Sequence, residues 1–276
     1  MTIVGLLNPG AMGASIGAAA LTNVEEVLWT SEGRSDATRI RAEKAGLTNA
    51  GSFADLVDAS ELILSVCPPA SALELANEVF SLGFKGTYVD CNAIAPEQTR
   101  AIAEIASNKG ARLVDGGIIG GPAWQAAAGT KLWLSGPDIS EVTALFEHSP
   151  LHTGVAGSEI GAASALKMCF AAFTKGSTAL LAAVLAVADK EGVGDALAEQ
   201  WGEAFTRKTK QQVTTNSSKA WRFAGEMEQI AATFDSAGLP GGFHEAAADV
   251  FYRLSEFKDW QSKPAFDDLL QALQSK

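Results

Sequence analysis

The strongest constraint on the fold lies at the start of the chain, where a short apolar run meets a glycine-rich turn. Residues 3–7 (IVGLL) have the length of a buried strand, and residues 8–13 (NPGAMG) interrupt it. The small residues that follow, up to Gly17, suit the first turns of a helix. In such a strand–turn–helix unit, glycines let the backbone approach a pyrophosphate, which the free N–H groups at the helix start then bind. The stretch therefore predicts a dinucleotide-binding βαβ unit.

The glycine fingerprint of this turn is incomplete, because Asn8 stands where the first glycine of G-x-G-x-x-G is expected. Asparagine adopts the left-handed backbone conformation more readily than most residues, so we expect Asn8 to replace that glycine. A glycine-rich turn without a ligand, as in any α/β protein, is the alternative interpretation. We predict that the whole turn contacts the cofactor, namely Asn8, Pro9, Gly10, Ala11, Met12 and Gly13.

Strands and helices alternate through the first half of the chain. Apolar runs predict further strands at 26–30, 62–66, 87–91, 111–115 and 131–135, with helical segments between them. This pattern predicts an α/β doubly wound parallel sheet (Rossmann fold). From about residue 154 we expect no strand, and Ala/Leu-rich helical patterns are found at 159–190, 195–215, 217–235 and 241–257. We expect a nucleotide-binding domain over residues 1–153 and an α-helical substrate and dimerisation domain over residues 154–276.

The composition limits the classes of partner. A formal charge of −11 would repel a phosphate backbone, so we expect no nucleic-acid partner. Three cysteines without paired spacing indicate thiols in a reducing compartment, and three scattered histidines offer little for a metal site. The apolar stretch 179–188 is too short to span a bilayer, and the N-terminus does not resemble a signal peptide. We expect a cytoplasmic protein with no metal and no membrane contact.

The residues after the second strand indicate which dinucleotide is bound. The adenosine ribose is read about twenty residues after the glycine turn, where an NAD site usually has a carboxylate. Here Thr30 and Ser31 occupy the strand tip, with Arg34 and Ser35 just beyond. A guanidinium and hydroxyls suit a 2′-phosphate, so we predict NADP, with NAD as the alternative if Glu32 folds toward the ribose.

Later strand ends add candidate cofactor contacts. Val66, Cys67 and Pro68 form a rigid segment that would flank the cofactor, and Asn92 follows the next strand, where a nicotinamide amide or ribose would be held. Ligands of doubly wound sheets bind at the carboxyl ends of the strands.

Two further features concern the substrate. The segment 115–122 (DGGIIGGP) has four glycines in eight residues, so its exposed N–H groups suit an anionic substrate, and we assign Ile119, Gly120 and Gly121 to the substrate site. Lys167 lies in a nearly all-apolar helix and shares a face with Ser164, Phe170 and Thr174, which we also assign to the substrate site. Hydride transfer between an alcohol and a carbonyl needs a proton donor or acceptor at the oxygen, a role that Lys167 can fill. A lysine whose charged head snorkels to solvent is the alternative.

Together these motifs resemble the β-hydroxyacid dehydrogenase superfamily, in the branch with a phosphogluconate-dehydrogenase-like C-terminal domain. The resemblance rests on the glycine turn with its Met12-Gly13 pair, on 89–96 (VDCNAIAP), on the 115–121 loop and on 161–167 (GAASALK). It implies an NAD(P) domain, a helical domain and a homodimer through the C-terminal helices. By position, Lys167 corresponds to the catalytic lysine of the family.

The chain departs from the family at substrate-binding positions. The family asparagines three and four residues after the lysine are Phe170 and Ala171 here, the serine before Gly-Gly is Ile119, and the second glycine of the lysine motif is Ala163. The pocket should therefore be more apolar. We predict an NADP-preferring oxidoreductase acting on a hydroxy acid or related carbonyl compound, with Lys167 as general acid/base. The alternatives are an imine reductase-like enzyme and a non-catalytic NADP-binding scaffold or sensor.

Overall fold

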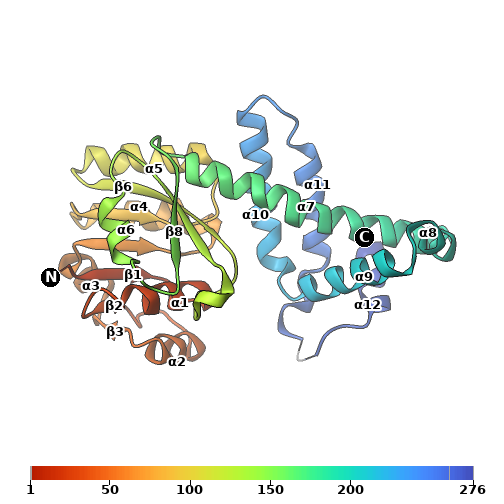
Figure 1. The fold of residues 1–276 in the computed structure, drawn as a ribbon, viewed down its shortest axis with the longest axis horizontal. Helices are drawn as coiled ribbons and strands as arrows, with labels where there is room; N and C mark the ends of the chain where they lie inside the picture. The colour runs from red at the N-terminus through yellow and green to blue at the C-terminus, as the bar shows by residue number, and fades with distance from the viewer. Residues whose placement is uncertain (1, 261, 276) are drawn as a thin grey trace. The chain divides into compact units, whose positions relative to one another are not determined.

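The computed structural model describes residues 2–260 and 262–275, and the chain divides into two compact units, one ending at Lys167 and one beginning at Met168 (Figure 1). The first unit contains one mixed sheet with helices on both faces. Its elements are β1 (Val4–Leu7), α1 (Ala11–Ala20), β2 (Val27–Trp29), α2 (Asp36–Lys44), β3 (Thr48–Asn49), α3 (Phe53–Ala59), β4 (Leu62–Ser65), α4 (Ala72–Ser81), β5 (Thr87–Asp90), α5 (Pro96–Asn108), β6 (Arg112–Ile119), β7 (Lys131–Ser135), α6 (Ser140–Leu145) and β8 (His152–Gly157).

The eight strands follow the order β3-β2-β1-β4-β5-β6-β7-β8, and every neighbouring pair is parallel except β6 with β7. The chain runs outward from β1 to β3 and then returns to place β4 on the other side of β1. The strand order therefore reverses between β1 and β4, which is where doubly wound sheets bind nucleotides. The predicted fold class is confirmed, with one antiparallel pair in the sheet.

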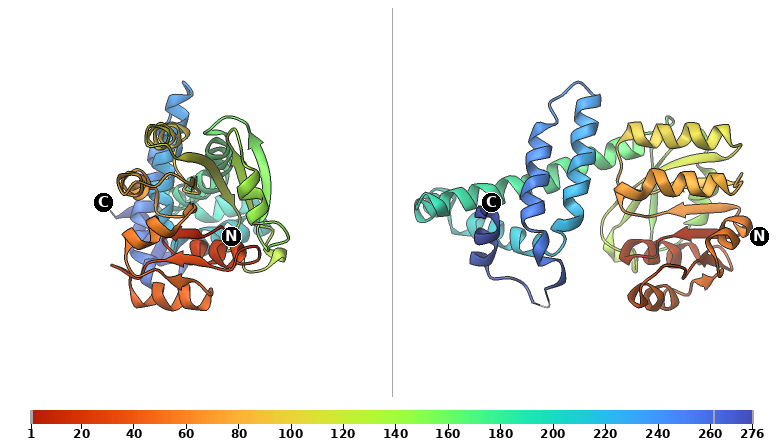
Figure 2. Two further views of the ribbon diagram at one scale, coloured as in Figure 1. Left: turned by 90° about the vertical axis from the view of Figure 1, so that its left-hand side faces the viewer. Right: turned by 180° about the vertical axis from the view of Figure 1, so that it is seen from behind.

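Alternate side chains of the strands pack into two separate hydrophobic cores, one on each face of the sheet. Val4 and Leu6 of β1 pack with α1, α2 and α6, whereas Leu7 packs with α3, α4 and α5 on the opposite face. Helices cover both faces of the sheet (Figure 2). Because successive side chains of a strand point to opposite faces, buried parallel strands are apolar at nearly every position. This is why residues 62–65 could be recognised as a strand from their apolar run.

Two strand predictions are wrong. The strand expected at 111–115 continues to Ile119, so Gly116 and Gly117 lie in β6 and not in a loop. The segment 152–157, placed in the helical half by the sequence, forms the edge strand β8 beside β7. No residue of β8 is fully buried and two are glycines, so the strand lacks the apolar signal that marks the central strands.

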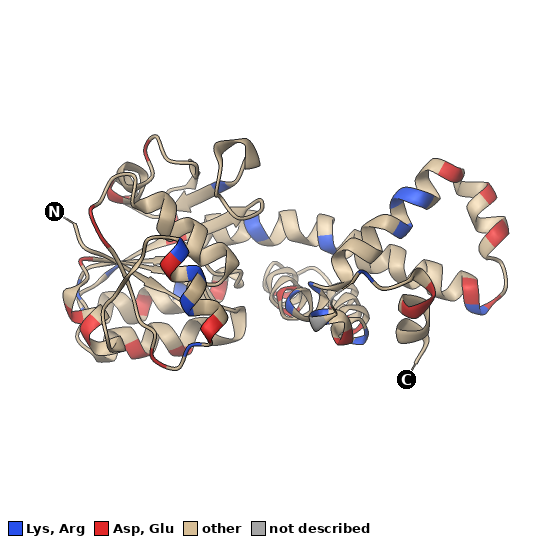
Figure 3. Cartoon of the chain, turned by 90° about the horizontal axis from the view of Figure 1, so that it is seen from below, with Lys and Arg blue, Asp and Glu red and all other residues tan. Residues whose placement is uncertain are grey.

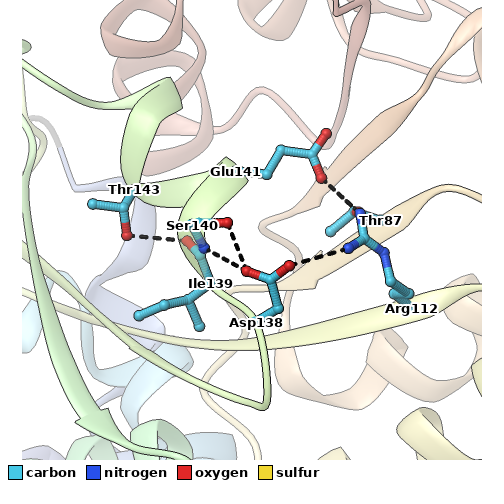
Figure 4. Close-up of polar contacts among 7 residues, drawn as sticks. All are labelled: Thr87, Arg112, Asp138, Ile139, Ser140, Glu141 and Thr143. Carbon is cyan, nitrogen blue, oxygen red and sulfur yellow. Dashed lines mark hydrogen bonds and ion pairs between the residues drawn. The ribbon is translucent and has the colours of Figure 1, made fainter.

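The N-terminal edge of the sheet contains an ion-pair cluster. Arg112 at the start of β6 donates to Thr87 at 2.7 Å and to Glu141 at 3.0 Å, and it pairs with Asp138 at 3.5 Å (Figure 4). Asp138 also accepts from the backbone and hydroxyl of Ser140, and these bonds lower its pKa. Because the cluster is at the opposite strand ends from the glycine turn, we interpret it as structural.

The second unit is helical. Its elements are the later part of α7 (Ala162–Lys190), α8 (Gly194–Trp201), α9 (Glu203–Ser217), α10 (Ala220–Ser236), α11 (Gly242–Arg253) and α12 (Phe266–Gln274). The single helix predicted over 195–215 is wrong, since Gly202 at φ 80° separates α8 from α9. A left-handed residue ends a helix, and glycine takes that conformation without a side-chain clash. Buried apolar side chains of α10 and α11 form the core, including the Phe223–Phe251 ring pair at 5.4 Å.

Helix α7 is long and apolar enough to cross a membrane by length and composition alone. Its charged residues are Lys167, Lys175 and two residues at its end, and Figure 3 shows how few charges the helix carries. Its first turn is bonded to β6, and Gln274 of α12 donates to Ala186 O of the later part at 3.0 Å. These contacts are those of a helix integrated into a globular fold.

Candidate functional site

The turn between β1 and α1 has the backbone expected of a nucleotide-binding turn. Asn8 has φ 62°, so the prediction that it takes the left-handed conformation is confirmed. A Cβ at Gly13 would lie 2.4 Å from Asn8 O, so only glycine lets α1 pack this closely on the turn. Gly10 is the N-cap of α1 and has no side chain to bond the first N–H groups of the helix. Those groups are available to an anion.

Two buried polar atoms at this edge fit a ligand. Within the described part of the chain, neither Asn8 Oδ1 nor Arg34 Nε has a hydrogen-bond partner. Buried polar groups are nearly always bonded, so an unpaired acceptor beside the turn and an unpaired guanidinium donor point to a missing partner. A dinucleotide with an extra phosphate offers hydroxyl donors to the first and phosphate acceptors to the second. The residues present therefore fit an NAD(P) dinucleotide.

The side chains at the tip of β2 are mostly bonded to other protein groups, at the end of β3 and at the start of α2. Thr30 donates to Gly51 O at 3.0 Å, Ser31 pairs with Asn49 at 3.1 Å, and Ser35 caps α2. Glu32, the residue that would favour NAD, accepts from Phe53 N at 3.1 Å at the start of α3. That bond holds the carboxylate of Glu32 on α3.

Three arginines lie at the adenosine end, and one of them, Arg39, donates to the backbone oxygens of Arg34 and Ser31, both at 3.4 Å. Arg34 is half-buried; burial lowers its pKa, whereas Cys67 and Glu78 raise it. Arg41 of α2 donates to Pro9 O at 3.2 Å and so braces the glycine turn. The sequence analysis missed Arg41, because nothing in its helical context distinguishes it from an ordinary surface charge.

Asn92 connects two strand ends. Its Oδ1 accepts from Cys67 N at 2.6 Å, and its amide nitrogen donates to Ser65 and Asp90, both at 3.0 Å. The side chain is therefore buried and bonded, and it fixes the Val66–Pro68 segment beside the glycine turn. Burial, with Asp90 adding to it, raises the pKa of the Cys67 thiol to about 12, so the thiol is protonated at neutral pH. The contacts that Asn92, Val66, Cys67 and Pro68 make with a cofactor stay a prediction.

Four polar residues form a buried row across neighbouring strands of the sheet. Ser65, Asp90, Asp115 and Ser135 are in register on β4, β5, β6 and β7, and each is at most 1 % exposed. Burial, together with the charge of Asp115, raises the pKa of Asp90 to about 7, against bonds from Asn92 that lower it. We call this set the polar row. The sequence analysis missed it, because register cannot be read from one strand at a time.

Asp115 holds the first turn of α7. Its Oδ2 accepts from the backbone N–H groups of residues 161, 163 and 164 at 2.9, 3.0 and 3.1 Å, and from Ser135 Oγ at 2.8 Å. Its Oδ1 accepts from Ser164 Oγ at 2.6 Å, and Ser164 also bonds to Thr99 of α5 at 2.9 Å. A carboxylate suits the positive end of a helix dipole. Ser164, predicted to bind substrate, is 1 % exposed and is held within this network.

The following residues of β6 fix Lys167. A Cβ at Gly117 would lie 2.6 Å from Ala163 O and 3.2 Å from Lys167 Cβ, so glycine is needed for α7 to approach the strand. Lys167 Nζ donates to Ile118 O at 2.7 Å. Successive positions on α7 are thus contacted by Asp115, Gly117 and Ile118 of β6. These contacts place the amino group of Lys167 at the carboxyl end of β6.

The predicted substrate residues are divided between β6 and α7. Ile119 ends β6, Gly120 has φ 130°, and Gly121 O accepts from Thr130 Oγ1 at 2.6 Å. Phe170 is exposed on α7, and Thr174 Oγ1 donates back to Phe170 O at 3.0 Å. The structure therefore brings Lys167 together with the segment that leads into Ile119–Gly121, and substrate contacts of all five residues stay a prediction.

The model for the NAD binding domain of 6-phosphogluconate dehydrogenase matches residues 2–150, and a domain of unknown function matches residues 188–254. An uncharacterized 28.5 kDa protein of Methanothermus fervidus is 33 % identical over 174 residues, which cover 63 % of this chain and 66 % of that protein, just under two thirds of its length.

Solved structures show the same fold along the whole chain. A conserved protein of unknown function, described as similar to 3-hydroxyacid dehydrogenases, is 25 % identical with a TM-score of 0.65, and the match covers 93 % of this chain and 98 % of that one. A reductive aminase from Aspergillus terreus, solved with NADPH and ethyl levulinate, is 18 % identical with a TM-score of 0.57, covering 99 % and 100 %. The resemblance predicted from the sequence motifs is thereby confirmed.

Proposed function

Because the chain belongs to the family of the NAD binding domain of 6-phosphogluconate dehydrogenase, we propose that it is an NADP-preferring oxidoreductase that uses Lys167 as general acid/base. The family and fold are those of NAD(P)-dependent oxidoreductases. The observation that carries the proposal is the bond from Lys167 Nζ to Ile118 O at 2.7 Å, at the carboxyl end of β6. An ammonium there can reach a substrate atom bound next to β6.

The roles of the residues follow from their positions. When bound, NADP supplies or accepts the hydride. The glycine turn and the start of α1 would hold the pyrophosphate, and Arg34 would bind the 2′-phosphate. Lys167 would give a proton to the substrate oxygen during reduction, or remove it during oxidation, while Ile118 O holds its head in place. Ser65 and Asp90 of the polar row hold Asn92, which in turn holds the Cys67 segment. Asp115 of the same row holds the start of α7. These bonds would therefore set the position of the cofactor relative to the lysine.

We consider two substrate classes. A hydroxy acid or related carbonyl compound follows from the family. An imine is favoured by the apolar Ile119 and Phe170 at positions where the resemblance leads us to expect polar residues, and one structural neighbour is a reductive aminase. Oxidation of NADPH with a panel of ketoacids and cyclic imines separates the classes. NADPH binding without turnover of any compound would favour the scaffold or sensor alternative.

Removing the guanidinium of Arg34 should weaken NADPH selectively. A charge-assisted hydrogen bond contributes about 1.5–3 kcal/mol, so Arg34→Ala should raise the Kd for NADPH roughly 10- to 100-fold. The Kd for NADH should change less than about twofold, because NADH lacks the 2′-phosphate. Both values can be measured by fluorescence titration, with Lys44→Ala, an exposed cation at the end of α2, as the control. An equal loss for both cofactors would contradict the assignment.

We also propose a homodimer formed through the C-terminal helices. On α7, Phe170, Phe173, Ser177, Leu180, Val184 and Val187 follow the alternating three–four spacing of a coiled-coil seam. Phe173, Leu180 and Val187 are 76, 49 and 60 % exposed in the single chain. An apolar hollow, lined by Val184, Val187, Val193 and Leu197 among others, continues the seam. A seam on one helix can pair with its own copy, as a two-fold dimer requires.

A charge in this seam should split the dimer. The unmodified chain should have twice the monomer mass of 28.7 kDa in light scattering, and Leu180→Glu should have the monomer mass. The exposed Ala54→Glu on α3 adds the same charge away from the seam and should stay dimeric. A monomeric unmodified chain, or a dimer unaffected by Leu180→Glu, would contradict the proposal.

The cysteines and the proposed cofactor bear on the compartment in which the protein acts. We propose that it acts in the cytoplasm, because Cys67, Cys91 and Cys169 are free thiols and NADP is an intracellular cofactor.

A further inference from the structure

The loop after β6, residues 120–130, is closed at its base. Thr130 Oγ1 donates to Gly121 O at 2.6 Å. Gly120 has φ 130°, and a Cβ there would lie 2.8 Å from the Thr130 Cα. The two ends of the loop are therefore held against each other, and the residues between them, including the short helical turn Ala126–Ala128, form a tip. We call these residues the β6 loop.

The β6 loop is also tied to the nucleotide-binding turn. Ala123 N donates to Ser15 Oγ at 2.9 Å, and Ser15 Oγ in turn donates to Met12 O at 2.8 Å. Ala123 is buried, whereas the neighbouring residues on both sides are exposed. The first residue of the loop, Gly120, lies two residues after Ile118, whose carbonyl oxygen accepts a hydrogen bond from Lys167. The β6 loop is therefore anchored to the glycine-turn helix and begins beside the lysine.

Trp124 projects from this anchored loop. It follows the buried Ala123 directly and is 47 % exposed. Its neighbours at the tip are Gln125 and three alanines, and residues 116–130 contain no charged residue. Among the described residues of the first unit, the exposed large apolar side chains are Ile40, Leu82, Trp124 and Val155, and Trp124 alone of these is aromatic. An indole on a fixed backbone offers a large apolar contact with few rotamers to lose.

We propose that Trp124 contacts the substrate and selects compounds that carry an aromatic or bulky apolar group next to the carbonyl or imine carbon. This inference rests on the proposed function, because it places the reacting atom beside Lys167. The uncharged β6 loop has no cation to pair with a substrate carboxylate, and its hydroxyl at Thr130 is already bonded to Gly121. The loop therefore favours an uncharged substrate over a small hydroxy acid.

The test uses binding as well as turnover. The protein loaded with NADP⁺ cannot reduce a ketone, so its affinity for acetophenone, whose phenyl group is bonded to the carbonyl carbon, and for 2-butanone can be measured by calorimetry. We expect the unmodified protein to bind the phenyl ketone about tenfold or more tightly, given the area an aromatic ring buries. Trp124→Ala should remove most of that preference, whereas Trp124→Phe should keep it within about threefold.

Two controls make the outcome specific. The Kd for NADPH should change less than about twofold in both variants. The substitution Leu82→Ala removes an equally exposed apolar side chain after α4 and should leave the ketone preference unchanged. An unmodified protein without a phenyl preference, or a preference that survives Trp124→Ala, would overturn the proposal. A dimer that dissociates in Trp124→Ala would show that Trp124 serves a subunit contact, which also overturns it. If the unmodified protein binds the phenyl ketone more tightly but turns over neither compound with NADPH, the proposed function is contradicted. The role of Trp124 in binding would still stand.

Discussion

We expect the substitution Lys167→Ala to lower the turnover number by roughly 10²- to 10⁴-fold, the range that general acid–base catalysis contributes, while the Kd for NADPH should change less than about twofold. The reason is that Lys167 Nζ is held by Ile118 O at 2.7 Å at the end of β6, and the glycine turn does not include the lysine. Stopped-flow or steady-state oxidation of NADPH measures the first quantity, and fluorescence titration measures the second.

The control for this prediction is a lysine outside the site. Lys109→Ala removes a cation at the end of α5 and should leave both quantities unchanged. Turnover of Lys167→Ala at the unmodified rate would show that another group transfers the proton. Equal losses of turnover and NADPH affinity would mean that the substitution disturbs the fold, and Lys167→Met, which keeps the aliphatic stem, would then separate the two effects.

We expect the substitution Asp115→Ala to destabilise the protein by roughly 2–6 kcal/mol, because at least two buried donors lose their acceptor and each costs about 1–3 kcal/mol. Those donors are the N–H groups of Gly161 and Ser164 at the start of α7. Ala163 N keeps a second acceptor in Ser135 Oγ, and Ser164 Oγ keeps Thr99, so they lose less. Such a loss is a large part of an ordinary domain stability of about 5–15 kcal/mol.

Urea unfolding followed by circular dichroism measures this effect. The matched control is Asp138→Ala, which removes an exposed carboxylate that bonds to Ser140 and Arg112 at the opposite edge of the sheet. It should cost much less, because water can replace the lost bonds. Equal unfolding free energies for the two variants would contradict the view that Asp115 anchors the helix that carries Lys167.

The substitution Asp115→Asn should also lower the turnover number and leave the Kd for NADPH unchanged. The reason is that the altered side chain contacts the start of α7, which carries Lys167, and not the glycine turn.

Much of the fold could be predicted from local patterns. The apolar runs of β1 and β4 and the glycine turn are signals carried by neighbouring residues, and the left-handed conformation of Asn8 followed from the glycine that it replaces. The edge strand β8 could not be predicted in this way, since its partner β7 supplies the pairing and its own residues are half exposed. Gly116 and Gly117 were placed in a loop because their close approach to α7 is a tertiary contact.

In the site, too, features with a local sequence signal were predicted, and features that depend on long-range contacts were not. Lys167 stood out because a cation in an apolar helix is unusual, and the structure gives it a partner on the strand that carries the predicted substrate residues. Asp115 and Arg41 were missed because their partners lie 46 or more residues away on α7 and 32 residues away on the glycine turn. Asn92, which was predicted to contact the cofactor, has a buried amide that holds the Cys67 segment, and its contact with the cofactor stays a prediction. Hydrogen-bond partners distant in the chain are what a single sequence does not display.

The central claim is that the glycine turn and Arg34 hold NADPH beside Lys167. A parallel titration of the unmodified protein with NADPH and NADH, read by fluorescence, tests it most directly. We predict saturable binding of one cofactor per chain, with NADPH bound about tenfold or more tightly than NADH, as a single charge-assisted contact to the 2′-phosphate would give. Failure of both cofactors to bind, or tighter binding of NADH, would contradict the account.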